Sequence, residues 1–178
     1  PPARRRRRAR APGGGVNTSA VQAAIHADEC CVPGAHQVGM LFDVAGPLDR
    51  ARVATAVSVL QARHALLRST FREVDGRLAR VVHDSLPAEV EWLTTTYEQG
   101  LEFVRSASMR AIDVSRQPPF RILVCALGPD RVLLHLLLHH HAYDAVTTTV
   151  IGRELLLLLS GAALGPAWAD HGVFVDTE

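Results

Sequence analysis

The residue types best suited to chemistry lie close together in the segment 136–147, whose sequence is LLLHHHAYDAVT. An apolar run leads into His139, His140 and His141, and Asp144 follows three residues later. A neutral imidazole accepts and returns a proton near physiological pH. A histidine at a strand end, followed by a carboxylate that fixes the local geometry, is therefore a plausible general base.

Two other interpretations of these histidines stay open. Alternation along a strand would place His139 and His141 on the same face as His135, with His140 on the other face. The buried members would then only hydrogen-bond to their neighbours. A metal site would instead use His139 and His141 with Asp144 as a third ligand. The chain offers no obvious further ligand, so no metal is expected.

The elements that must position this cluster follow from the apolar pattern and the turn residues. They are strands over 37–44, 120–127 and 131–138, helices from 49 to the mid-sixties, within 94–109 and over 146–159, and a hairpin of 69–74 and 77–82. The Asp75-Gly76 pair suits the tight turn of that hairpin. The apolar run 131–138 is typical of a central strand that is buried on both faces. The element order predicts an α/β fold class, an α+β two-layer sandwich in which helices cover a mixed β-sheet.

The near-neutral formal charge of +1 hides an uneven distribution. All 19 basic residues are arginine, and six of them lie within the first ten positions, which leaves 13 basic against 18 acidic residues and a net charge of −5 for the rest. Nucleic-acid binding needs cations on the folded surface, so no nucleic-acid partner is expected. Residues 1–15, made mostly of Arg, Ala, Pro and Gly, are expected to form a disordered arm or linker, unless they contact an anionic partner.

The cysteines and the apolar segments bear on the cellular compartment. Cys30 and Cys31 are adjacent and Cys125 lies in an apolar run, so there is neither a disulfide framework nor a spaced pair of zinc ligands. A reducing cytoplasm fits this usage best. The longest apolar windows are far shorter than the ~20 residues of a membrane-spanning helix, so no membrane partner is expected.

Several motifs, in the same order along the chain, resemble one known family. The run HHHAYDA at 139–145 resembles the HHxxxDG motif of the condensation domains of nonribosomal peptide synthetases, which belong to the chloramphenicol acetyltransferase-like HxxxD acyltransferases. The other matches are RHALLRSTF at 63–71 to RHExLRTxF, GPLD at 46–49 to GPLD, IDVSRQPPFR at 112–121 to FDLxxxPLLR, and, more weakly, SAVQ at 19–22 to SxAQ. Five ordered matches are far more specific than one HxxxD pattern alone.

By this resemblance the reaction is acyl transfer. The amine of an aminoacyl group, held on the phosphopantetheine arm of a carrier protein, attacks an upstream acyl or peptidyl thioester and forms an amide. No cofactor is bound directly. His140 matches the histidine that positions or deprotonates the amine, His139 would support the loop, and Asp144 matches a structural aspartate that pairs with an arginine. Three arginines are candidate partners of that aspartate: Arg63, Arg68 and Arg121.

The resemblance also implies the domain organisation. Residues 16–165 match the N-terminal lobe of a two-lobed domain, and 166–178 would begin the connection to a C-terminal lobe, the second expected partner beside the carrier proteins. Ala145 replaces the glycine of the motif and Ala65 replaces a glutamate. These departures leave open a non-catalytic module that docks a carrier or a tailoring enzyme. A stand-alone acyltransferase with an alcohol acceptor is a further alternative.

Overall fold

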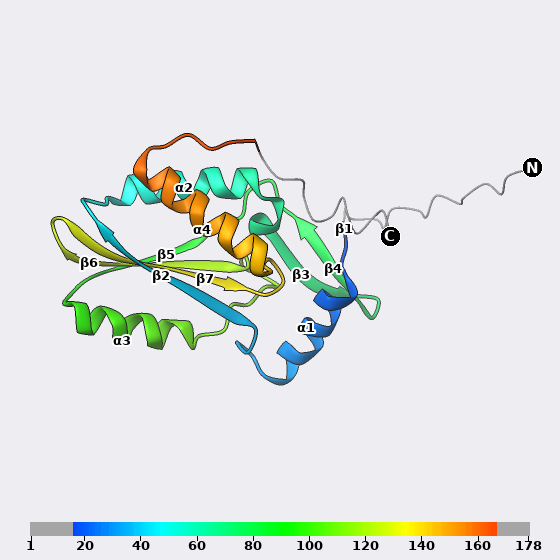
Figure 1. Cartoon of the computed structure of the whole chain (residues 1–178). Coiled ribbons are helices and arrows are strands. Elements are labelled where there is room, and N and C mark those ends of the chain that lie inside the picture. The colour runs from blue at the N-terminus through cyan, green and yellow to red at the C-terminus, as the bar shows by residue number, and fades with distance from the viewer. Residues whose placement is uncertain (1–15, 167–178) are drawn as a thin grey trace, which may run out of the picture.

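The computed structural model describes residues 16–166 (Figure 1). The helices of this part are α1 (Ala20–Cys31), α2 (Arg50–Arg63), the short 3-10 helix η1 (Ala65–Arg68), α3 (Tyr97–Ser108) and α4 (Ala145–Ser160). The strands are β1 (Val16–Asn17), β2 (Gln37–Ala45), β3 (Ser69–Val74), β4 (Arg77–Val82), β5 (Glu89–Thr94), β6 (Phe120–Gly128) and β7 (Arg131–His139). No helix among these residues is long and apolar enough to cross a membrane.

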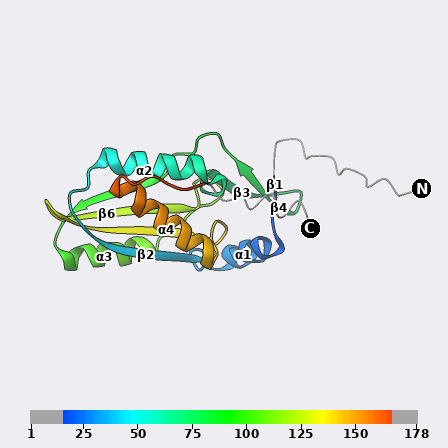
Figure 2. The ribbon, with the colours of Figure 1, turned by 45° about the horizontal axis from the view of Figure 1, so that its top comes forward.

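The main sheet has the strand order β2-β7-β6-β5 and is mixed, because β5 and β6 run parallel while the other neighbours are antiparallel. A smaller sheet, β1-β4-β3, lies with α1 beyond one end of the main sheet (Figure 2). That end is the one at which β7 finishes, since Gln37 at the start of β2 pairs with His139 at the end of β7. The predicted fold class, a mixed sheet covered by helices, is confirmed.

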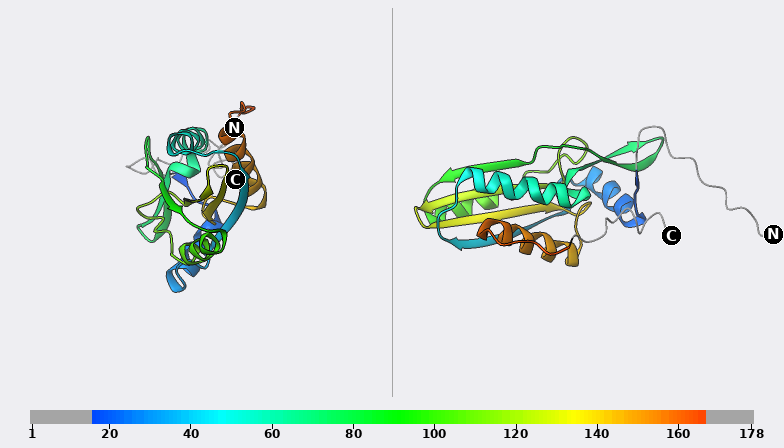
Figure 3. Two further views of the ribbon diagram at one scale, coloured as in Figure 1. Left: turned by 90° about the vertical axis from the view of Figure 1, so that its left-hand side faces the viewer. Right: turned by 90° about the horizontal axis from the view of Figure 1, so that it is seen from above.

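Helices pack on both faces of the main sheet (Figure 3). On one face, α2 and α4 pack against alternate residues of β6 and β7. Leu60 and Leu155 on the helices and Ile122 and Leu136 on the strands are among the buried side chains of this layer. On the other face, α3 packs on Leu123, Cys125 and Leu133. Every residue of β7 after Arg131 is buried, as predicted for a central strand. The last strand before the histidines is therefore the most firmly enclosed one.

Most predicted elements are present within a few residues of the expected bounds. Asp49 caps α2 by accepting a hydrogen bond from the backbone N–H of Arg52 at 2.7 Å. Asp75 and Gly76 both have positive φ, 52° and 70°, as the predicted tight turn between β3 and β4 requires. Gly161 ends α4 in the left-handed conformation.

Besides the short elements β1 and η1, two elements were not predicted from the sequence. The first is α1, which buries only Gln22 and Ile25 and so has almost no apolar periodicity to detect. The second is β5, where apolar residues alternate with glutamates just after Pro87. His64 is the C-cap residue of α2, so this helix ends within the predicted mid-sixties. The proposed arm, 1–15, lies outside the described residues, and the predicted division of the chain at 16–165 and 166–178 stays a prediction.

Candidate functional site

The candidate site is the turn between β7 and α4. The turn contains His140 and His141, and His139 is the last residue of β7. Three backbone hydrogen bonds fix this turn: His139 N–H to Pro119 O at 2.9 Å, His140 N–H to His36 O at 2.8 Å, and Ala142 N–H to His139 O at 2.9 Å. Two of the acceptors belong to segments remote in sequence. The turn is therefore positioned by the tertiary structure rather than by its own residues.

His140 has the geometry of a base that is ready to accept a proton. Its Nδ1 lies 2.8 Å from the carbonyl oxygen of Tyr143, and its ring stacks on the Tyr143 ring with centroids 4.5 Å apart and planes 15° apart. Because a carbonyl can only accept, Nδ1 carries the hydrogen. In the neutral ring, Nε2 then keeps its lone pair. The side chain is half-buried.

His139 and His141 form a buried pair on the other side of the turn, as the alternation predicted. Their ring centroids are 4.7 Å apart and their Nδ1 atoms 2.9 Å apart, and neither residue is more than 1% exposed. Burial lowers the pKa of His141 to about 3, with His139 adding to the shift. Burial also lowers the pKa of His139, although Glu29 opposes this. Both rings are therefore neutral at physiological pH and unsuited to proton exchange with a substrate.

Asp144 and Ala145 lie at the start of α4. Asp144 is exposed and caps the helix: its Oδ1 accepts a hydrogen bond from Thr147 N–H at 2.7 Å. A carboxylate is also favourable at the positive end of the helix dipole. Ala145 is the first helical residue. Its φ is not positive, since Asp75 is the one non-glycine residue of the described chain with positive φ. The backbone here consequently does not require the glycine that the family motif carries.

The hydrogen bonds and ion pairs of the three candidate arginines lie away from Asp144. Arg63 Nε contacts both carboxylate oxygens of Glu154, at 3.0 and 3.1 Å. Arg68 donates to the carbonyl of His83 at 2.7 Å, and the buried Arg121 pairs with Glu89 on β5. The structure thus gives each arginine a structural partner of its own.

The Arg63 contact is part of a larger, partly buried cluster. His64 Nε2 lies 2.6 Å from Glu154, and Arg63 also donates to the carbonyls of Gly165 and Pro166. Glu154 is on α4, whereas Arg63 and His64 end α2. The motif RHALLRSTF therefore begins with two residues that join the helices on one face of the sheet.

Several residues near the histidines were not singled out from the sequence. Gln22 on α1 donates to the carbonyl of His141 at 2.8 Å, and the ring of His36 lies 6.2 Å from that of His140. Glu29 lies 3.5 Å from His139 Nε2. The signal that could have found α1 is the capping box of Ser19 and Gln22, both of which belong to the weak SAVQ match.

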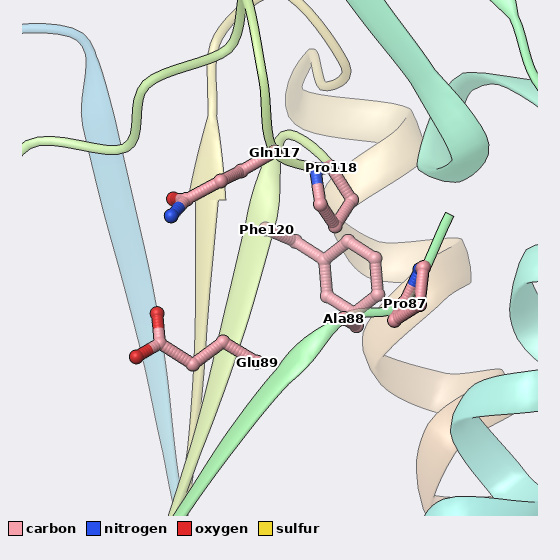
Figure 4. Close-up of a pocket in the computed structure, with 6 residues that line it drawn as sticks. All are labelled: Pro87, Ala88, Glu89, Gln117, Pro118 and Phe120. Atoms are coloured by element: carbon pink, nitrogen blue, oxygen red, sulfur yellow. The ribbon is translucent and has the colours of Figure 1, made fainter.

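A small hollow of about 240 Å³ opens at the same end of the sheet (Figure 4). Its apolar wall is made by Pro118 and Phe120, with Pro87 and Ala88 from the segment that enters β5. Pro119, between the first two, is the residue whose carbonyl holds His139. The hollow thus lies at β6, the strand next to β7, and β7 ends in the motif. Among residues 16–166, no group of three or more His, Cys, Asp or Glu side chains could hold a metal ion.

Comparison with known sequences supports the resemblance. Residues 33–166 match the family model described as "Condensation domain". Tyrocidine synthase 2 of Brevibacillus parabrevis is 34% identical over 119 residues, which are 67% of this chain and 3% of that protein. Nonribosomal peptide synthetase kk1B of Curvularia clavata is 29% identical over 129 residues, 71% of this chain and 1% of that protein. The chain therefore spans only a small part of the curated relatives that it matches.

Solved structures show the same fold. The first condensation domain of the calcium-dependent antibiotic synthetase superposes with a TM-score of 0.79 at 18% identity, over 92% of this chain and 42% of that one. The X-domain solved in complex with OxyB from teicoplanin biosynthesis superposes with a TM-score of 0.81 at 21% identity, over 94% of this chain and 38% of that one. In each case the matched part is less than half of the solved chain.

Proposed function

The chain belongs to the condensation domain family, and we propose that it carries the proton-accepting half of an amide-forming site in nonribosomal peptide synthesis. The substrates are an acyl or peptidyl thioester and an aminoacyl amine, each presented on the phosphopantetheine arm of a carrier protein. The name of tyrocidine synthase 2 and the condensation domains among the structural relatives support this choice of reaction class.

The observation that carries the proposal is the hydrogen bond from His140 Nδ1 to the Tyr143 carbonyl. It leaves Nε2 as the proton acceptor. The amine attacks the thioester carbonyl, and His140 Nε2 takes the proton that the nitrogen loses as the C–N bond forms. The C–S bond then breaks, and His140 returns the proton to the leaving sulfur as the thiol forms. The imidazole thus ends neutral and no further co-reactant is needed.

A second lobe would complete the site. The solved relatives extend well beyond the part that this chain matches, since 42% or less of each of the two described above is covered. The half-buried face of His140 and the hollow beside Phe120 are the surfaces on which that lobe and the two carrier-bound substrates would meet. Asp144 acts in this scheme as a structural residue that begins α4 and closes the turn.

The test is amide formation by the full-length protein between two loaded carrier proteins. His140→Ala should lower the rate on the order of 10² to 10⁴-fold, the usual contribution of a general base, without lowering the melting temperature. His83→Gln, a substitution of the histidine that directly follows β4, is the matched control and should keep the rate within about threefold.

Unchanged product yield in His140→Ala would sink the catalytic assignment. If the wild type itself binds loaded carriers but makes no amide, and His140→Ala binds them equally well, the non-catalytic docking module replaces the proposal. Product formed with an alcohol acceptor and not with an amine would select the third alternative.

A further inference from the structure

Glu29, near the end of α1, is a nearly buried carboxylate that none of the sequence motifs explains. Its side chain is 12% exposed. Oε1 accepts a hydrogen bond from the backbone N–H of Gly34 and lies 3.5 Å from Nε2 of His139, while Oε2 accepts from the N–H of His36 at 3.3 Å. One carboxylate therefore joins α1, the loop before β2 and the end of β7.

The loop that Glu29 holds is the one that holds His140. The carbonyl of His36 accepts the backbone N–H of His140 at 2.8 Å. The N–H of the same residue, His36, donates to Glu29. A displacement of the carboxylate would consequently also move His36, whose carbonyl accepts the hydrogen bond from the backbone of His140.

Glu29 also faces the protonated nitrogen of His139. The backbone N–H of His141 approaches Nδ1 of His139 at 3.3 Å, and a backbone N–H can only donate. Nδ1 of His139 is therefore an acceptor, and its neutral ring carries the hydrogen on Nε2, toward the carboxylate. The close contact of the two Nδ1 atoms, 2.9 Å, then requires the hydrogen of His141 to lie on its Nδ1.

We propose that Glu29 is a positioning residue for His140: it holds the 34–36 loop against the motif turn and selects the Nε2–H tautomer of His139. The role in catalysis rests on the function proposed above, whereas the structural link does not. Glu29 touches neither substrate nor His140 itself, and it acts through the loop and through the first histidine of the motif. A carboxylate suits this position because both of its oxygens accept hydrogen bonds, and together they face three N–H groups.

The first test needs no variant. Nitrogen-15 NMR of the histidine side chains of the wild-type chain should show His139 as the Nε2–H tautomer and His141 as the Nδ1–H tautomer. The opposite assignment for His139 overturns the proposal, even if every Glu29 variant fails to fold.

The second test compares Glu29→Gln with Glu102→Gln, an exposed glutamate of α3 that pairs with Arg105. A carboxamide has only one acceptor oxygen, so Glu29→Gln leaves an N–H group without its partner. We expect hydrogen exchange at the His140 amide to become about tenfold faster and the Nε2–H population of His139 to fall. Glu102→Gln should change neither, and unchanged exchange in Glu29→Gln overturns the proposal.

The catalytic consequence is measured in the full-length protein. Glu29→Gln should lower kcat about tenfold and change KM less than twofold, because a misplaced base affects the chemical step rather than binding. A fall in kcat with unaltered exchange at His140 also counts against the proposal. If His140→Ala retains full activity, the proposed function fails, and the two NMR measurements still decide whether Glu29 positions the turn.

Discussion

The motif turn has histidine side chains on both sides, but those on one side are buried and the one on the other side is half-buried. His139 and His141 are buried and contact each other; Nε2 of His139 faces Glu29 at 3.5 Å, and Nε2 of His141 makes no hydrogen bond within the described structure. His140, between them, is half-buried and has its Nδ1 hydrogen bonded. Adjacency in sequence therefore places them in different environments, because alternate residues at a strand end face opposite ways.

The difference assigns the histidines to different tasks. Burial disfavours the protonated imidazole, so the folded state loses stability as the solution becomes acidic. A half-buried imidazole with one nitrogen committed can exchange a proton through the other. The interior pair is thus suited to supporting the turn, and the outer histidine is the one that the proposed function uses.

Lowering the pH should have the largest effect, because it decreases the free energy of unfolding through the buried histidines. Burial lowers the pKa of His135 to about 4 and that of His141 to about 3, from 6.5. The unfolded chain binds these protons first, so the stability is fully present above pH 6.5 and is lost as the pH falls toward 4 and 3. Each histidine should cost roughly 3 kcal/mol of unfolding free energy by pH 4, measured by urea unfolding.

The variant His141→Leu is the internal control for that measurement. It removes one buried titrating ring, so its unfolding free energy should fall less steeply between pH 7 and 4. An equally steep slope in the variant, or a flat profile in the wild type, would contradict the idea that the interior histidines are held neutral.

The next effect tests how tightly the interior side is packed. A Cβ added at Gly39 on β2 would lie 2.1 Å from Nε2 of His135, a residue that is 4% exposed. Gly39→Ala should destabilise the protein by about 2 to 3 kcal/mol, seen as a lower melting temperature. Gly128→Ala, with nothing within 4 Å of the added Cβ, should stay within about 0.5 kcal/mol. Equal melting temperatures for the two variants would refute the close packing.

The smallest effect concerns the open side of the turn. Asp144→Ala removes the acceptor for Thr147 N–H at the start of α4 and should cost about 1 kcal/mol. Asp144→Asn keeps a capping oxygen and should restore most of that loss in thermal unfolding. If Asn behaves like Ala, the charge of Asp144 rather than its cap is what stabilises the turn.

Prediction from sequence succeeded where a single local pattern controls the outcome. Asp49 begins α2 and Asp75-Gly76 closes the hairpin, because capping and positive φ depend on the residues themselves. It failed for α1, which packs against the motif turn through Gln22 rather than through an apolar stripe. The contacts of Arg63 could not be chosen from sequence either, since Glu154 lies 91 positions away and carboxylates are chemically alike.

Motif spacing and strand alternation are properties of neighbouring residues, so the sequence is enough to identify the family, the strand that leads into His139, and the histidine that matches the family's proton acceptor. What surrounds each histidine depends on the fold. The tautomer of His140 follows from the Tyr143 carbonyl, and that of His139 from His141 and the Glu29 carboxylate. Hydrogen bonds and burial depend on which remote segments fold against the turn, and no local pattern encodes them.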